Sequence, residues 1–317
     1  MVDGLKNPYR SARKQHFLMV KKSWQLYLFL LIPVAWVIVF SYVPMYSGLQ
    51  IAFKQYSIRD GISGSPWIGI FNFEKFFSSY QFSRVLKNTI VLSLYSLVAG
   101  FPFPIILALG MNAMLNSKLK KTVQTITYIP HFISTVVLVG ILLRVFNARI
   151  GIYGVLGMLF TGSYPADILG NANSFLHMYV WSGVWQNMGW GTIIYMAALS
   201  SVDPSLHEAA EIDGADRFKR VIHIDLPCIL PTAIILLIMD AGHIMSVGFE
   251  KVYLMQNNLN LQMSEVISTY VYKVGIAAGG GDFPYATAIG LFNSFVNLTI
   301  LLLVNSISRK VSETSLW

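Results

Sequence analysis

Two ionisable residues, Asp240 and His243, lie in an apolar stretch long enough to cross a membrane, at positions i and i+3. On a helix, this spacing puts both side chains on one face. Ionisable groups inside a membrane-crossing helix are costly, so they mark functional sites. The two could line a water-filled path and exchange hydrogen bonds with hydroxyl groups. They could also bridge to a neighbouring helix, or form half of a proton relay.

A second group of polar and aromatic residues lies between positions 183 and 190. Its members are Gly183, Trp185, Gln186, Asn187 and Trp190. Indole rings can stack on the apolar faces of ring-shaped molecules, while amides bind their hydroxyls. Trp185 and the preceding Trp181 could equally form an interfacial belt or pack between helices. We expect His131, beside Pro130, to satisfy carbonyls freed by the proline rather than to bind metal, since no second ligand lies at suitable spacing.

The elements that carry these residues are predicted to cross a lipid bilayer. Hydrophobic residues make up 55% of the 317 positions and charged residues only 12%. Crossing a bilayer takes about 20 residues of helix, and continuous apolar runs favour helices over alternating barrel strands. Six runs qualify: 26–43, 89–111, 123–143, 176–199, 229–249 and 286–307. We expect an all-α membrane protein with a transmembrane domain at 26–307 and terminal tails at 1–25 and 308–317.

The positions of lysine and arginine predict the orientation. They gather before the first run and at 118–121, 217–220 and 309–310. Basic residues favour the cytoplasm, so both termini are expected there. Attraction to anionic lipid then explains the net charge of +8, and nucleic acid is not expected as a partner. The single cysteine, Cys228, excludes an internal disulfide.

The segments between the runs are expected to be connections rather than domains. Residues 44–88 and 250–285 read as loops, and the glycines at 279–281 predict a sharp turn. The apolar segment 150–160 is too short to span, which favours an interfacial or re-entrant helix. The first run lacks a cleavage site of small residues and is long for a signal peptide, so we expect it to be retained.

The loop between the fourth and fifth runs collects acidic charge and reads as a helix, a break and a second helix. Asp203 is a suitable N-cap and Pro204 suits the first helical position. Gly214 can adopt the left-handed conformation that ends a helix. Asp216 could cap a second helix, in which Phe218, Val221 and Ile222 share a face. Charge alone would fit a solvated connector.

The spacing within 208–227 is more specific than the charge. Glu208-Ala209-Ala210, then Gly214, Ile224 and Leu226-Pro227 resemble the EAA motif of bacterial ABC importer permeases. In that family the element docks as a coupling helix on an ATPase subunit. The resemblance implies this role for the residues Glu208, Ala209, Ala210, Glu211, Asp213, Gly214 and Ala215. No GxxxxGK[ST] phosphate loop occurs here, so this chain is expected to bind no cofactor, with ATP and Mg on the separate ATPase.

Other segments are similar to the carbohydrate-importing permeases related to the maltose transporter. They include 42–44, 68–77, 128–130 and 281–286, and the branch is the one for fragments of polysaccharides such as alginate or pectin. The resemblance implies a type I importer permease in the bacterial cytoplasmic membrane, without enzymatic activity of its own. It also implies four kinds of partner: a second homologous permease, two ATPase subunits, an extracytoplasmic binding protein and an oligosaccharide cargo. Cargo contacts in such relatives fall near Gly183, Asn187, Trp190, Asp240 and His243.

Three alternatives remain at this point. The chain could be an ABC permease for another solute, such as an amino acid, peptide or phosphate. An intramembrane enzyme using Asp240 and His243 would leave the EAA spacing to chance. A proton-coupled carrier usually carries two related halves, and no internal repeat is visible. Nothing resembles a metal site or a nucleophile motif.

Overall fold

The computed structural model describes residues 22–277 and 281–311, which form two units divided after Gly69. The first unit contains α2 (Trp24–Val37), a π-helical turn (Ile38–Tyr42), α3 (Val43–Ala52) and α4 (Gly61–Gly64). The first three run continuously over Trp24–Ala52, long and apolar enough to cross a bilayer. The wide turn precedes Pro44, which has no N–H to donate into the helical ladder.

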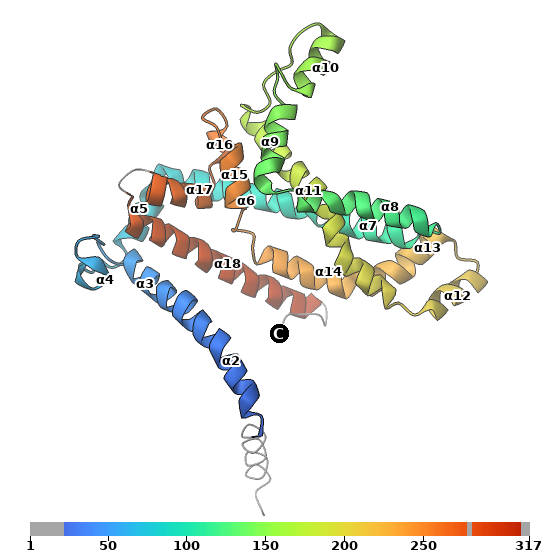
Figure 1. Ribbon diagram of the computed structural model, residues 1–317, viewed down its shortest axis with the longest axis horizontal. Coiled ribbons are helices and arrows are strands. Elements are labelled where there is room, and N and C mark those ends of the chain that lie inside the picture. Colours follow the sequence, from blue (N-terminus) through green and yellow to red (C-terminus); the bar gives the residue numbers. More distant parts are fainter. Residues whose placement is uncertain (1–21, 278–280, 312–317) are drawn as a thin grey trace, which may run out of the picture. The chain divides into compact units, whose positions relative to one another are not determined.

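The second unit is helical throughout its described part (Figure 1). Its first half comprises α5 (Phe71–Ser78), α6 (Tyr80–Gly100), α7 (Pro102–Asn112), α8 (Ser117–Tyr128), α9 (Thr135–Val145), α10 (Ile152–Thr161) and α11 (Ala172–Ser200). Its second half comprises α12 (Pro204–Ile212), α13 (Arg217–Arg220), α14 (Leu226–Ala241), α15 (Phe249–Met255), α16 (Leu261–Ser264), α17 (Ile267–Tyr272) and α18 (Phe283–Val311).

Helix α11 is the central element of this unit, since α6, α7, α8, α14 and α15 all pack against it. Its buried residues belong to two apolar clusters, one shared with α6, α9 and α15 and one with α7 and α14. A third cluster joins α5 and α6 to α17 and α18 around Phe76. Gly189 lets α11 approach α8 closely, because a Cβ atom at this position would lie 2.0 Å from the Thr127 carbonyl oxygen.

The third expected span is not one continuous helix. A 3-10 turn at Ile129–Phe132 separates α8 from α9, and the two helices are bent by 97° (Figure 1). Pro130 cannot donate an N–H, and the extended Ser134 starts α9 by accepting a hydrogen bond from the Val137 N–H. The run expected at 123–143 is therefore broken in the structure, and its crossing of the membrane stays a prediction.

Length and composition identify four spanning helices in the described part of the chain, or five with the bent pair. The four are Trp24–Ala52, Tyr80–Asn112, Arg217–Ala241 and Phe283–Arg309. Helix α11 has 29 residues, enough to span, but its polar and small residues make it less apolar. The expected count of six, the span bounds and the cytoplasmic termini stay predictions.

The expected loops also differ from the structure. Residues 44–88 contain α5 and much of α3 and α6, and residues 250–285 contain α16, α17 and most of α15. Of these short helices, α5, α15 and α17 bury apolar side chains in the core, as Phe76 and Ile267 do. The short helix expected at 150–160 is α10. Gly279, Gly280 and the basic residues before the first span other than Lys22 lie outside the described residues.

Candidate functional site

The acidic loop after α11 has the helix-break-helix form that its sequence predicts. The Asp203 carboxylate accepts a hydrogen bond of 2.9 Å from the Ser205 N–H and begins α12, and this bond lowers the pKa of Asp203. Gly214 has a φ of +75° and ends the turn. Asp216 caps α13 by accepting a hydrogen bond of 2.8 Å from the Lys219 N–H. The two caps and the left-handed glycine are confirmed.

The chain after Asp216 differs from expectation. Only 217–220 is α-helical, and Val221–Asp225 forms a wider π-helical turn that runs directly into α14. The expected helical face of Phe218, Val221 and Ile222 is therefore not formed as a regular i, i+3, i+4 stripe. The π turn ends shortly before Pro227, which lacks the N–H that a regular ladder would use.

Helix α12 presents an open surface made of the expected coupling residues. Glu208, Ala209, Glu211 and Asp213 are exposed, and the apolar side chains of Ile212 and Phe218 are 87% and 72% exposed. Ala210 and Ala215 are half-buried. The Glu211 carboxylate pairs with Arg220 within the loop, which leaves Glu208 and Asp213 as the coupling-residue carboxylates without a described ion pair. This mixture of small, acidic and exposed apolar groups suits a protein partner.

A buried carboxylate that the sequence did not single out anchors the loop. Asp225 is 2% exposed. Its Oδ1 atom lies 3.3 Å from Nε2 of His207 and accepts a 3.3 Å hydrogen bond from Nδ2 of Asn112. These contacts tie α12 to the end of α7 and to the start of α14. The signal was available, since an aspartate beside Leu226-Pro227 is unusual in an apolar setting.

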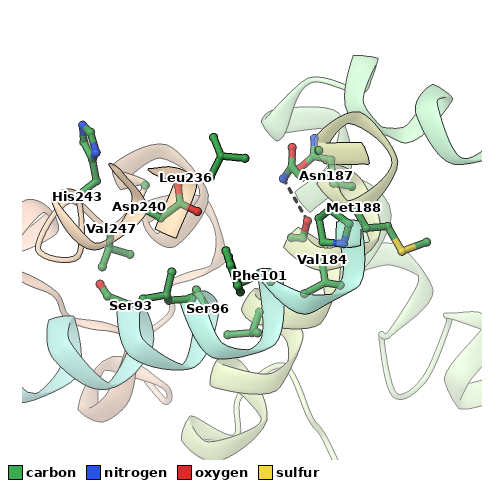
Figure 2. Close-up of a pocket in the computed structure, with 18 of the residues that line it drawn as sticks. Ser93, Ser96, Phe101, Val184, Asn187, Met188, Leu236, Asp240, His243 and Val247 are labelled. Carbon is green, nitrogen blue, oxygen red and sulfur yellow. Dashed lines mark hydrogen bonds between the residues drawn. The ribbon is translucent and has the colours of Figure 1, made fainter. Parts of the chain in front are cut away.

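A cavity of about 530 Å³ lies between α6, α7, α11, α14 and the segment that leads to α15. Five of the predicted site residues line it: Gly183, Gln186, Asn187, Asp240 and His243. Figure 2 shows Asp240 on α14 near Ser93 and Ser96 of α6, with Asn187 on α11 opposite. The structure thus brings together polar residues from helices on both sides of the acidic loop.

The two predicted tryptophans do not line this cavity. Trp190 stacks on the His131 ring with centroids 4.5 Å apart and planes within 5°. The Trp185 side chain is exposed outside the cavity lining. Trp181 donates 3.0 Å to the Tyr95 hydroxyl and packs edge-on against Phe103, which matches the packing alternative for this residue.

Asn187 and Gln186 fasten α11 to the break between α8 and α9. The Asn187 Oδ1 atom lies 3.0 Å from His131 Nδ1, and its Nδ2 donates 3.1 Å to the Gly183 carbonyl. Gln186 Nε2 donates 2.8 Å to the Ile133 carbonyl. His131 therefore bonds a side chain and not the carbonyls freed by Pro130, so that expectation is wrong. Gln186, in contrast, does satisfy a carbonyl at this break.

Asp240 and His243 are not a helical i, i+3 pair. Helix α14 ends at Ala241, and the His243 N–H donates 3.0 Å to the Asp240 carbonyl in a turn. The His243 ring points away from the Asp240 carboxylate in Figure 2, and its Nδ1 lies 2.9 Å from the Met239 carbonyl. Gly242 follows the end of the helix and lies directly against the Leu301 side chain of α18. The arrangement offers two separate polar groups and not a relay.

Six polar lining residues were missed by the sequence reasoning: Ser93, Ser96, Tyr179, Tyr195, Ser246 and Lys251. The hydroxyl oxygens of Ser93 and Ser96 are buried and have no hydrogen-bond partner among the described residues. Their i, i+3 spacing in an apolar run was a usable signal. Lys251 Nζ donates 2.8 Å to the Tyr179 carbonyl, and burial lowers the pKa of Lys251, in α15 beyond the spanning helices, to about 8.

The cavity lining can bind hydroxyl groups but offers no metal site. Hydroxyls, amides and a carboxylate supply donors and acceptors around an otherwise apolar space. Among the described residues, no three His, Cys, Asp or Glu side chains gather closely enough to hold a metal ion. Cys228, on α14, is exposed. The arrangement fits binding and passage of a polar molecule.

Known proteins resemble the chain over nearly its whole length. Residues 100–313 match the family described as binding-protein-dependent transport system inner membrane component. Protein LplB of Bacillus subtilis (strain 168) is 40% identical over 94% of this chain and 92% of its own. The polygalacturonan/rhamnogalacturonan transport system permease protein YteP of the same organism is 39% identical over 96% of this chain and 94% of its own.

Solved structures agree with these relatives. A chain from a bacterial ABC transporter involved in the import of the acidic polysaccharide alginate superposes with a TM-score of 0.86. It is 38% identical, and the match covers 94% of this chain and 99% of that one. A second structure of a bacterial alginate transporter, in complex with a periplasmic protein holding an alginate pentasaccharide, gives a TM-score of 0.85 at 38% identity.

Proposed function

Because the chain belongs to the family of inner membrane components of binding-protein-dependent transport systems, we propose that its cavity carries an oligosaccharide across the bacterial cytoplasmic membrane. The chain is a multi-pass permease subunit of an ABC importer and not an enzyme. The observation that carries the cargo proposal is the pair of unpartnered hydroxyls, Ser93 and Ser96, in a cavity that also holds Asp240 and Asn187.

The chemistry of these groups suits a sugar. A buried hydroxyl without a partner costs free energy, and a passing hydroxyl-rich cargo can supply the missing hydrogen bond. The apolar lining, including Phe101, Val184 and Leu236, contacts the carbon faces of sugar rings. Trp185 and Trp190 stay candidates for a path outside this cavity, since both are exposed.

The acidic loop supplies the coupling to ATP. We propose that Glu208, Ala209, Ala210, Glu211, Asp213, Gly214 and Ala215 dock on an ATPase subunit, which binds ATP and Mg. The exposed Ile212 and Phe218 side chains support this docking, and Asp225 transmits force from α12 to α7 and α14 through its contacts with His207 and Asn112. Closure of the ATPases would then shift the helices around the cavity between inward and outward states.

The complete importer is proposed to contain this chain, a second homologous permease, two ATPase subunits and an extracytoplasmic binding protein. The test is to purify the complex, reconstitute it in proteoliposomes with ATP inside, and measure uptake of oligosaccharides presented by the binding protein. ATP-dependent uptake is expected, and the double variant Ser93→Ala with Ser96→Ala should raise KM several-fold. Normal uptake kinetics in the Ser93, Asp240 and Asn187 alanine variants would remove this cavity from the cargo path.

A further inference from the structure

Lys251 places a positive charge on the wall of the cavity. Its Nζ atom donates 2.8 Å to the Tyr179 carbonyl and lies 4.7 Å from the centre of the Tyr179 ring. The side chain is half-buried and reaches the cavity from α15. The contacts with Tyr179 hold the ammonium group in position.

This ammonium group has no carboxylate partner within 4.0 Å among the described residues. Some other cations of the same unit do have one, for example Lys75 with Asp282 at 2.7 Å, Lys273 with Glu265 at 3.2 Å, and Arg84 also with Glu265. An ammonium group carries three N–H donors, and the described contacts use one of them. Charges withdrawn from water are normally paired, so Lys251 is poised for an anion that arrives from outside the chain.

Helix α11 leaves room for such an anion beside the ammonium group. A Cβ atom at Gly183 would lie 3.3 Å from Lys251 Nζ, so this glycine keeps the space open. Asn187 follows one turn later on the same face, and its Nδ2 bonds the Gly183 carbonyl. Asp240 lies outside ion-pair distance of Lys251, so it can serve hydroxyls away from the charge. A cation thus stands beside groups that bind hydroxyls.

We infer that Lys251 recognises a carboxylate of the cargo, which makes the substrate class an oligosaccharide of uronic acid units. The inference rests on the proposed function, since it assumes that the cavity carries an oligosaccharide. A molecule rich in hydroxyls with a carboxylate on each ring satisfies the serine hydroxyls, the amide and the ammonium group together. The charge-assisted hydrogen bond to the carboxylate is the strongest of these contacts and separates acidic from neutral sugars.

The test uses the complete complex in proteoliposomes with its binding protein. The probes are trigalacturonate, its fully methyl-esterified form, trimannuronate and a neutral arabinotriose. Lys251→Met removes the charge at similar length, Lys251→Arg keeps it, and Lys75→Met removes a cation of similar type that does not line the cavity. We expect Lys251→Met to raise KM for the acidic probes at least about tenfold, with Lys251→Arg and Lys75→Met near wild type. Uptake of the neutral probes should stay unchanged.

The outcomes separate this inference from the proposed function. Equal losses for acidic and neutral probes in Lys251→Met, or acidic uptake as in wild type, would overturn the role of Lys251 and leave oligosaccharide import standing. Import of neutral probes alone by the wild type would also overturn it. Import of no oligosaccharide by an assembled wild-type complex would instead remove the proposed function. The affinity of the binding protein for each probe is measured separately, so that differences in uptake can be corrected for differences in delivery to the permease.

Discussion

Nδ1 of His131, in the bend between α8 and α9, lies 3.0 Å from Oδ1 of Asn187 on α11. Asn187 also lines the cavity, so one amide joins the bend to the proposed cargo path. The Trp190 ring stacks flat on the His131 ring, with the ring centroids 4.5 Å apart, and holds the imidazole in position. Direct contacts through the imidazole therefore hold the bend against the cavity face of α11.

Replacing His131 by phenylalanine should keep the stack on Trp190 but lose the hydrogen bond to Asn187. A lost hydrogen bond costs about 1 kcal/mol, so KM for oligosaccharide uptake should rise about fivefold. Uptake into proteoliposomes measures this, with thermal unfolding of the complex as the control for folding. Unchanged KM in a folded complex would show that the contact does not position Asn187 for transport.

Gly189→Ala should destabilise the second unit, because the added Cβ would lie 2.0 Å from the Thr127 carbonyl oxygen. Relieving such an overlap forces α11 and α8 apart, at a cost of about 1–3 kcal/mol. Thermal unfolding in detergent measures the loss. The matched control is Gly140→Ala in α9, where a Cβ meets nothing within 4 Å and the helix should gain slightly. Equal melting temperatures for both variants would contradict the close approach.

Gly214→Pro should separate ATP hydrolysis from transport or block assembly. Proline fixes φ near −65°, whereas Gly214 has +75°, so the break after α12 cannot keep its angle. Gly214→Asn is the control, since asparagine tolerates the left-handed region. The ATPase rate, sugar uptake and subunit co-purification are measured together, and the sugar affinity of the binding protein should not change. Normal coupled uptake in Gly214→Pro would exclude a lever role for the loop.

Asp225→Ala should loosen the connection between α12 and the helices around the cavity. Its carboxylate is buried and contacts both His207 and Asn112, so its loss should cost about 1.5–3 kcal/mol. We expect less uptake per ATP hydrolysed, with cargo KM little changed. Glu74→Ala, which removes an exposed carboxylate of α5 outside the loop, is the control for charge. A rise in KM without a change in coupling would place Asp225 in the cargo path instead.

The pH dependence of uptake should differ between acidic and neutral cargo. Burial lowers the pKa of Lys251 to about 8, so its charge disappears as the pH rises through this value and uptake of trigalacturonate should fall relative to arabinotriose. The other titratable groups of the cavity are Tyr179, Tyr195, Asp240 and His243. Lys251→Arg keeps its charge and should abolish the fall. A fall that persists in Lys251→Arg would assign it to another group.

Loss of folding would not mimic this pH effect. The ordinary pKa of lysine is 10.5, so between about pH 8 and 10.5 the unfolded chain binds more protons at Lys251 than the folded chain does. Stability attributable to this group therefore rises with pH in that window. Thermal unfolding at pH 7 and pH 9 checks that the complex remains folded while acidic uptake declines.

The sequence by itself determined the class of the protein and the local form of its acidic loop. Caps and turns depend on neighbouring residues, so Asp203, Gly214 and Asp216 could be placed from spacing alone. Apolar runs likewise follow from local composition, and they fall on α2, α6, α7, α11, α14 and α18, although α6 begins at Tyr80, well before its run, and α14 ends early at Ala241. The spacing of Glu208, Gly214 and Pro227 identified the family.

The tertiary structure decided which polar groups meet. Pro130 and Ser134 mark a local break, but the 97° angle between α8 and α9 and the hydrogen bonds of Gln186 and Asn187 that hold it depend on the position of α11. Lys251 lies in a segment expected to be a loop, and only the folding of α15 onto α11 brings its charge to Gly183. Ser93 and Ser96 read as ordinary residues of an apolar run until the neighbouring helices enclose them without partners. Contacts between distant segments therefore form the cavity, whereas local sequence specifies the caps and the turn of the acidic loop.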